Sequence, residues 1–305
     1  MPGVGPPLVV VCGPTAVGKT DAAITLAPRL DAEIVCADSR TVYRGMDIGT
    51  AKPTPAQRAR VPHHLLDIAE PDQVVTLATY RDHAVQVITD LRTRRRVPLL
   101  IGGSGLYIRA VVDGFTIPEV PPDAALRAQM EADERARPGR LHAKLQQVDP
   151  QAAARIHPRN IRRLVRALEV YERTGQPISF LQRTDPIGAA VQVGLTMDRE
   201  ALYSRIDARV DEQLAAGLVA EVEQLLARGY APTLPAMRGL GYKEIVEHLQ
   251  GRVGLEEAGR RLKRNTRHLA KRQFTWFRRD SRIRWLDVTR LTSDQVAEEI
   301  DRMIQ

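Results

Sequence analysis

The sequence of 305 residues contains only two cysteines, Cys12 and Cys36, and only four phenylalanines and two tryptophans. Two cysteines exclude a disulfide-dense secreted scaffold and a zinc site made of cysteines. No run of apolar residues approaches the roughly 18 that a membrane-spanning helix requires. The first seven residues, Met1 to Pro7, lack the charged segment of a signal peptide. We therefore expect two reduced cysteines, no association with a membrane, and a cytoplasmic protein.

Acidic residues are too few to balance the basic ones, since 37 Asp and Glu accompany 45 Lys and Arg and give a net charge of +8. Residues 260–284 contain eleven Lys or Arg and one acid, and residues 155–173 contain six Arg and two acids. In the first segment several basic residues recur at helical spacing, namely Arg260, Arg264, Arg267, Lys271 and Arg278. This pattern is typical of a helix that binds a nucleic-acid backbone, although a solvated helix face produces it too.

Apolar segments alternate with helical patterns over the first hundred residues. The sequence predicts helices over 19–30 and 76–93 and strands over 8–11, 33–37 and 97–101. Such alternation predicts an α/β fold with a parallel sheet flanked by helices. Ligands then bind at the carboxyl ends of the strands.

The pattern changes after Gly114. A Pro-rich linker over 117–122 leads into a segment that is helical to about residue 183, without a strand signal. A strand is predicted over 191–197, and residues 200–279 are predicted to be helical throughout. We therefore expect a core domain of residues 1–115 plus 190–305 with a helical C-terminal part. An all-helical domain of residues 116–189 is expected as an insertion.

Residues 13–20 match the phosphate-loop pattern G-x-x-x-x-G-K-[ST], between a predicted strand and a predicted helix. Glycines let successive backbone N–H groups converge on one anion, and the helix amino end adds positive charge. Lys19 would contact a distal phosphate, and the Thr20 hydroxyl would bind Mg²⁺. A ligand with two or three phosphates is expected, and the pattern leaves the reaction open.

Asp38 is the first polar residue after the second predicted strand, so it lies at the same edge as the phosphate loop. A carboxylate there could take a proton from a nucleophile or bind Mg²⁺ through water. Capping of a turn with Ser39 is the structural alternative. The third strand ends in Gly102-Gly103-Ser104-Gly105, without the acidic residue of an ordinary ATPase.

Several stretches, in this order, resemble the tRNA dimethylallyltransferase family, also called tRNA isopentenyltransferase or IPP transferase. They cover residues 13–20, 38–53, 62–67, 102–107, 166–170, 238–243 and 271–278. The likeness extends over nearly the whole chain and is to the bacterial type, without a zinc-finger tail. It implies a P-loop-type core with a helical insertion.

The resemblance also implies the reaction. A dimethylallyl group would pass from dimethylallyl diphosphate to N6 of adenosine 37 in tRNA, next to the anticodon. The products would be N6-(dimethylallyl)adenosine and diphosphate, with Mg²⁺ as cofactor and without ATP hydrolysis. The implied partners are tRNA and dimethylallyl diphosphate, and we expect a monomer.

Carried over position by position, the resemblance makes Asp38 the general base, with Lys19 and Thr20 as further catalytic residues. The implied diphosphate contacts are Gly13, Pro14, Thr15, Ala16, Val17, Gly18, Lys19, Thr20, Arg127 and Arg209. The implied tRNA contacts are Asp38, Ser39, Arg40, Thr41, Ser104, Arg127, Arg162, Arg163, Leu164, Val165, Arg166, Arg238, Gly239, Leu240, Gly241, Tyr242, Lys243, Lys271, Arg272, Gln273, Phe274, Thr275, Trp276, Phe277 and Arg278. Thr41 stands where many members of the family have Gln.

Two other functions fit part of the pattern. A small-molecule or nucleoside kinase would use the phosphate loop and Asp38 but leave the basic segment at 260–284 without a role. A nucleotide-driven RNA-binding switch would bind ATP or GTP and form no alkylated product. Consumption of ATP with a small acceptor would identify the kinase.

Overall fold

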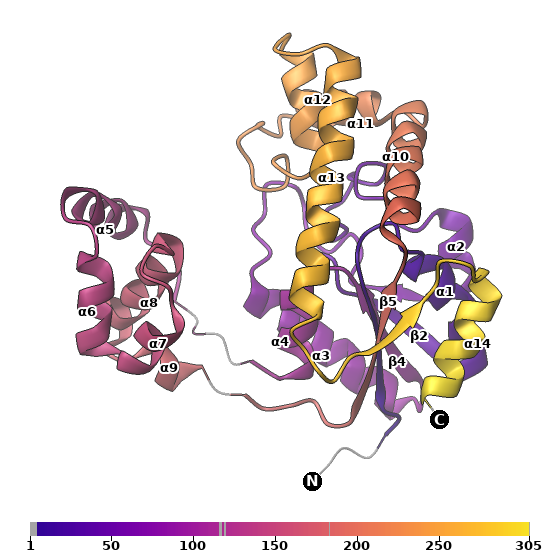
Figure 1. The fold of residues 1–305 in the computed structure, drawn as a ribbon, viewed down its shortest axis with the longest axis horizontal. Helices are drawn as coiled ribbons and strands as arrows, with labels where there is room; N and C mark the ends of the chain where they lie inside the picture. The colour runs from indigo at the N-terminus through magenta and orange to yellow at the C-terminus, as the bar shows by residue number, and fades with distance from the viewer. Residues whose placement is uncertain (1–4, 116–117, 119, 183, 305) are drawn as a thin grey trace. The chain divides into compact units, whose positions relative to one another are not determined.

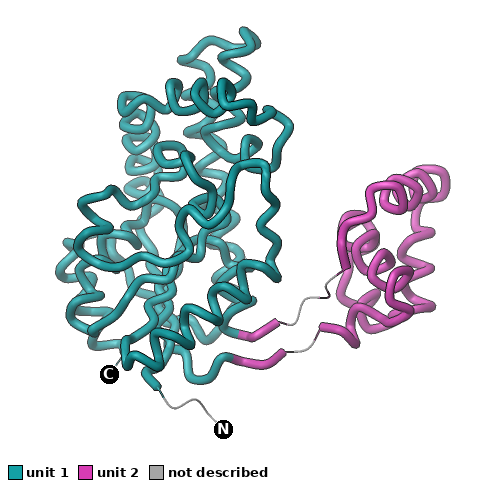
Figure 2. The backbone as a smooth tube through the Cα atoms, turned by 180° about the vertical axis from the view of Figure 1, so that it is seen from behind, with its two compact units in different colours: residues 1–112, 187–305 teal, residues 113–186 magenta. Residues whose placement is uncertain are grey.

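The chain divides into two compact units in the computed structural model, which describes residues 5–115, 118, 120–182 and 184–304. Unit 1 comprises residues 1–112 and 187–305, and unit 2 comprises residues 113–186 (Figure 2). The predicted domain boundaries lie three residues further along the chain at each junction. Ile117, where the predicted linker begins, and Arg183, where the predicted helical segment ends, lie outside the described residues.

Unit 1 contains a six-stranded sheet with the strand order β3-β2-β4-β1-β5-β6 (Figure 1). The strands are β1 (Leu8–Cys12), β2 (Ala32–Cys36), β3 (His63–His64), β4 (Val97–Gly102), β5 (Ala190–Thr196) and β6 (Arg284–Asp287). Every pairing is parallel, which confirms the predicted sheet. The central strands β2, β4 and β1 are neighbours, so the loops that follow them meet at one edge of the sheet.

Helices cover both faces of this sheet. On one face α1 (Lys19–Leu26), the 3₁₀ helix η1 (Ala27–Leu30) and α14 (Ser293–Ile304) enclose strand side chains such as Val9 and Val11. On the other face α3 (Leu77–Thr93) and α4 (Gly105–Val112) enclose Leu8 and Val10. Side chains of β1 point alternately to the two faces of the sheet, and helices cover both faces. All residues of this strand are therefore apolar, without the alternation of a half-exposed strand. A short helix, α2 (Pro55–Arg60), precedes β3.

Beyond β5 the chain forms a helical layer around its own apolar core. Its helices are α10 (Arg199–Ala215), α11 (Leu218–Ala227), α12 (Tyr242–Leu249) and α13 (Leu255–Phe277). The prediction of helix throughout 200–279 is wrong for residues 228–241, which form turns, and for the shorter stretches 216–217, 250–254 and 278–279. Gly229, Pro232 and Pro235 explain the longest interruption, because proline removes a helical hydrogen bond and glycine favours other backbone conformations.

Unit 2 is a bundle of short helices with a separate apolar core that includes Leu145, Leu164 and Leu168. The helices are α5 (Ala124–Ala136), α6 (Arg140–Val148), α7 (Pro150–Arg155), α8 (Ile161–Thr174) and α9 (Ile178–Leu181). An antiparallel bridge between Phe115 and Thr184 joins the two ends of the unit. Across the described ranges, no helix combines the length and apolar character that crossing a bilayer requires.

Candidate active site

The phosphate loop after β1 depends on two glycines. Gly13 has φ +146°, and a Cβ atom there would lie 2.6 Å from the backbone oxygen of Leu195 on β5. Gly18 has φ +98° and immediately precedes α1. Side chains other than hydrogen are strained in such backbone conformations. The two glycines therefore allow the loop to pass close to β5 and then turn into the helix.

Positive charge is concentrated beside this loop. The Nζ atom of Lys19 donates a hydrogen bond to the backbone oxygen of Pro14 at 2.7 Å. Burial, together with the charge of the nearby Arg209, lowers the pKa of Lys19 to about 8. Burial also lowers the pKa of Arg209. Two poorly solvated cations next to a helix amino end favour a bound anion, because the anion compensates both charges.

Asp38 lies at the end of β2, facing the same site. Its Oδ1 atom accepts a hydrogen bond from the backbone N–H of Arg40 at 2.8 Å. Burial raises the pKa of Asp38 above its usual range, while that hydrogen bond and the charge of Lys19 act in the opposite direction. A carboxylate with a raised pKa is a better proton acceptor, so this environment suits a general base.

A cavity of about 480 Å³ joins these groups to the helical layer. Asp38, Thr15 and Arg209 line it, together with three cations from different segments: Arg40, Arg238 and Arg272. An apolar wall comes mainly from α10 and α13 and consists of Ile206, Val210, Leu240, Leu262 and Leu269. The cavity therefore offers a base, cations for phosphate groups, and an apolar surface.

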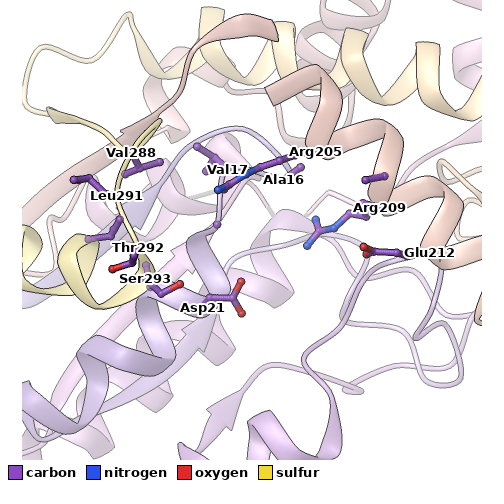
Figure 3. A pocket seen from close by; sticks show the side chains of 14 residues that line it. Ala16, Val17, Asp21, Arg205, Arg209, Glu212, Val288, Leu291, Thr292 and Ser293 are labelled. Carbon is purple, nitrogen blue, oxygen red and sulfur yellow. The ribbon is translucent and has the colours of Figure 1, made fainter. Parts of the chain in front are cut away.

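A second cavity, of about 390 Å³, lies on the other side of the phosphate loop. Figure 3 shows Arg205 and Arg209 extending from α10 toward it, with Ala16 and Val17 of the loop nearby. Opposite the loop, the cavity is lined by Val288, Leu291, Thr292 and Ser293. Arg209 lines both cavities, and residues of the phosphate loop line each of them, so Arg209 lies beside the loop.

Thr20 lines a third cavity, of about 610 Å³, together with Asp21. Within the described ranges, its hydroxyl has no hydrogen-bond partner, and no group of three His, Cys, Asp or Glu residues could hold a metal ion. A Mg²⁺ ion fits this arrangement, because Mg²⁺ commonly takes few protein ligands and completes its shell with phosphate oxygens and water.

The predicted tRNA contacts fall into different environments. Ser39, Arg40 and Ser104 line the 480 Å³ cavity. Thr41 is buried and does not line it; its hydroxyl lies 3.5 Å from the backbone oxygen of Asp38. The side chains of Leu164, Val165 and Phe277 are buried in apolar cores. Direct contact of these three side chains with tRNA is therefore contradicted.

The basic residues of α13 do not form one free stripe. Arg267 forms a bidentate ion pair with Asp207 of α10, and Arg260 pairs with Glu257 at 2.7 Å. In the described part of the chain, Arg264, Lys271 and Arg272 are exposed and take part in no ion pair. Part of the predicted stripe thus stabilises the packing of α10 on α13.

In unit 2, Arg127 and Arg166 share the fully buried Glu169. Arg127 makes two hydrogen bonds to it, of 2.7 and 2.8 Å, and Arg166 makes one of 2.7 Å. Burial acts to raise the pKa of Glu169, but the two arginines hold it below its usual range. Arg166 also donates to the backbone oxygens of Val120 and Pro118. Both arginines therefore have a structural role within this unit, whereas Arg162 and Arg163 are exposed.

One residue near the site has no signal in the sequence. Glu221 of α11 accepts hydrogen bonds from the backbone N–H groups of Asp47, Ile48 and Gly49, and from the Tyr242 hydroxyl at 2.6 Å. Gly49 and Tyr242 both line the 480 Å³ cavity. Glu221 thus holds one side of the cavity in place, although its position in a helical pattern predicts only a surface acid.

Known protein sequences resemble this chain over most of its length. A sequence model described as IPP transferase matches residues 41–280. A tRNA dimethylallyltransferase of Pelotomaculum thermopropionicum is 48% identical over 300 residues, covering 97% of this chain and 96% of that protein. One of Desulforudis audaxviator is 54% identical over 289 residues, covering 93% of both chains.

Solved structures also match this chain over nearly its whole length. The tRNA isopentenylpyrophosphate transferase of Bacillus halodurans matches with a TM-score of 0.73 and 43% identity, over 98% of this chain and 95% of that one. A eukaryotic dimethylallyltransferase, described as acting on tRNA, matches with a TM-score of 0.80 and 27% identity, over 96% of this chain and 76% of that one.

Proposed function

The chain belongs to the IPP transferase family, and from this premise we propose that its site transfers a dimethylallyl group from dimethylallyl diphosphate to N6 of adenosine 37. The enzyme is a tRNA prenyltransferase, and the alternative of a small-molecule kinase is not favoured. The proposed chemistry rests on one observation: Asp38, after β2, and Thr15, in the phosphate loop, line the same cavity.

Asp38 would act on the acceptor. The lone pair of an exocyclic adenine amine is delocalised into the ring, so the amine is a poor nucleophile. Asp38 would take the N6 proton as the N6–carbon bond forms, and such general-base catalysis contributes about 10²- to 10⁴-fold in rate. The hydrogen bond from the Arg40 N–H orients the carboxylate and leaves its other oxygen for the amine.

Lys19 and Arg209 would act on the donor. As the bond between the allylic carbon and the diphosphate oxygen breaks, its electron pair passes to the diphosphate, where negative charge develops. Lys19 and Arg209, which lie close enough for their charges to interact, would stabilise that charge together with N–H groups of the loop. The Thr20 hydroxyl would hold Mg²⁺, which when bound supplies further positive charge.

Arg40, Arg238 and Arg272 would hold the tRNA. A base in an RNA loop enters an enclosed cavity only after it leaves its stack, so phosphate contacts must hold the loop open. These three cations surround the cavity that contains Asp38. We include Arg162 and Arg163 of unit 2, which are exposed, among the proposed contacts. Arg127 remains a proposed diphosphate contact through Nη1, since Nε and Nη2 bind Glu169.

We further propose a monomer that acts in the cytoplasm. Light scattering after size-exclusion chromatography measures the oligomeric state.

The direct test of the function incubates the protein with unmodified tRNA, Mg²⁺ and dimethylallyl diphosphate, and then measures nucleoside masses. We expect one adenosine per tRNA to gain the mass of one dimethylallyl group, and sequencing of the modified fragment to place it at position 37. We expect the reaction to release diphosphate and to leave the concentration of any added ATP unchanged. ATP consumption with a small acceptor, and unchanged tRNA, would support the kinase instead.

A further inference from the structure

Gln273 of α13 connects two loops of the site. Its Oε1 atom accepts a hydrogen bond from the backbone N–H of Thr15 in the phosphate loop at 2.8 Å. Its Nε2 atom donates to the backbone oxygen of Gly103, after β4, at 3.0 Å. A Cβ atom on Gly103 would lie 2.3 Å from that Nε2 atom, so the close approach requires glycine. The amide therefore bridges the loops that follow β1 and β4.

The bridge continues toward the proposed base. Next to Gly103, the Oγ atom of Ser104 accepts a hydrogen bond from the backbone N–H of Ser39 at 3.0 Å, and the N–H of Ser104 donates to Ala37 at 3.2 Å. Ala37 and Ser39 flank Asp38. Gln273 thus joins the phosphate loop to the segment that carries Asp38 through one series of hydrogen bonds.

We propose that Gln273 is a positioning residue, which fixes the phosphate loop relative to Asp38 and ties both to α13. The inference rests on the proposed function and deepens it. It gives Gln273 a role within the protein beside the predicted tRNA contact, because its amide oxygen and one N–H of its amide nitrogen are bonded to protein backbone. The neighbouring Arg272 lines the cavity. A tRNA phosphate bound to Arg272 would therefore contact the same turn of α13 that carries Gln273 and, through it, the phosphate loop.

Loss of this bridge affects geometry rather than charge. In-line transfer requires the amine, the allylic carbon and the leaving oxygen to be aligned, and a displacement of about 1 Å costs up to roughly 10²-fold in rate. We expect Gln273→Ala to lower the single-turnover rate at least about tenfold, because Thr15 and Gly103 lose their common anchor. The affinity for tRNA should stay within about twofold, because the cations remain.

The experiment compares Gln273→Ala and Gln273→Glu with wild type and with Gln224→Ala, an exposed glutamine on α11. Glutamate retains an acceptor for the Thr15 N–H but places a second oxygen against the Gly103 oxygen, so it should also be impaired. Three quantities are measured: the dissociation constant for inorganic diphosphate by calorimetry without tRNA, the dissociation constant for tRNA, and the single-turnover prenylation rate. Circular dichroism and thermal unfolding establish that each variant is folded.

We expect both Gln273 variants to bind inorganic diphosphate at least about threefold more weakly and to react more slowly, while Gln224→Ala matches wild type. Weaker tRNA binding with unchanged rate and diphosphate affinity would overturn the inference in favour of a tRNA contact. A lower unfolding temperature alone, with diphosphate affinity and rate unchanged, would show a purely structural bond. A wild-type protein that binds diphosphate but prenylates no tRNA would refute the proposed function instead. The diphosphate comparison would still test Gln273.

Discussion

Replacing Arg238 and Arg272 with glutamine should reduce the dependence of tRNA binding on salt. Both side chains are exposed and both residues line the cavity that holds Asp38. Arg264 and Lys271 are also exposed, but at about 100° per residue they lie on the side of α13 opposite the cavity-lining Leu262. The two pairs therefore carry equal charge in different places, and each serves as the control for the other.

The expected magnitude follows from counting cations. Each phosphate contact to a single-stranded segment contributes about 0.7 to the slope of log affinity against log salt concentration. Loss of two contacts should make the slope shallower by about 1.4 for Arg238→Gln/Arg272→Gln. Arg264→Gln/Lys271→Gln should change it little, because those cations face away from the cavity.

The assay measures tRNA dissociation constants at several salt concentrations by fluorescence anisotropy, for wild type and both double variants. Thermal unfolding verifies that the variants are folded. Suppose instead that Arg238→Gln/Arg272→Gln has the wild-type salt slope, while the slope of Arg264→Gln/Lys271→Gln is shallower by about 1.4. The tRNA would then bind the outer face of α13. In that case the placement of the acceptor base in this cavity would be refuted.

Three further outcomes are expected. Asp38→Asn should lower the single-turnover rate at least about 10²-fold with unchanged tRNA affinity. Because burial raises the pKa of Asp38, the wild-type rate should fall on acidification at a pH above the usual carboxylate range, and a flat profile with an active Asn variant would contradict this role. Lys19→Ala should weaken binding of inorganic diphosphate; since the pKa of Lys19 is about 8, wild-type affinity should also drop between pH 7 and pH 9, whereas the variant should show no such step. Gly13→Ala should lower the free energy of unfolding by more than about 1 kcal/mol in denaturant titrations, because its Cβ atom meets the Leu195 oxygen. Gly254→Ala, with φ −69° and open space around it, is the control and should cost less than Gly13→Ala, because it loses only the preference for glycine over alanine at the N-cap of α13.

The central strands and the phosphate loop could be predicted because their signals are local. A fully buried parallel strand is a run of apolar residues, and the loop pattern needs a strand before it and a helix after it. Asp38 could be placed at the site because the carboxyl ends of parallel strands share one edge. By contrast, β3 is only two residues long and β6 is half exposed, so neither has a distinct pattern.

The partners of charged residues could not be predicted. Arg267 pairs with Asp207, 60 residues away, and Arg127 with Glu169, 42 residues away. Helical spacing shows which residues share a face but not which element packs against that face, so a paired arginine and a free one look alike. The bridge made by Gln273 spans 258 residues to Thr15 and has no local signal either.

The position of unit 2 in the chain has a consequence for synthesis on the ribosome. Strand β1 ends at Cys12 and pairs on one side with β4, but its partner on the other side, β5, begins only at Ala190, after the whole of unit 2. At about 5–20 residues per second, synthesis from Cys12 to Ala190 takes roughly 9 to 36 seconds, during which that edge of β1 has no partner. An unpaired apolar edge of this kind promotes aggregation, so we expect the nascent half-sheet to need protection while unit 2 folds around its own core. Protease sensitivity of ribosome-stalled chains should drop sharply once β5 has emerged, and equal sensitivity before and after that point would contradict this order of folding.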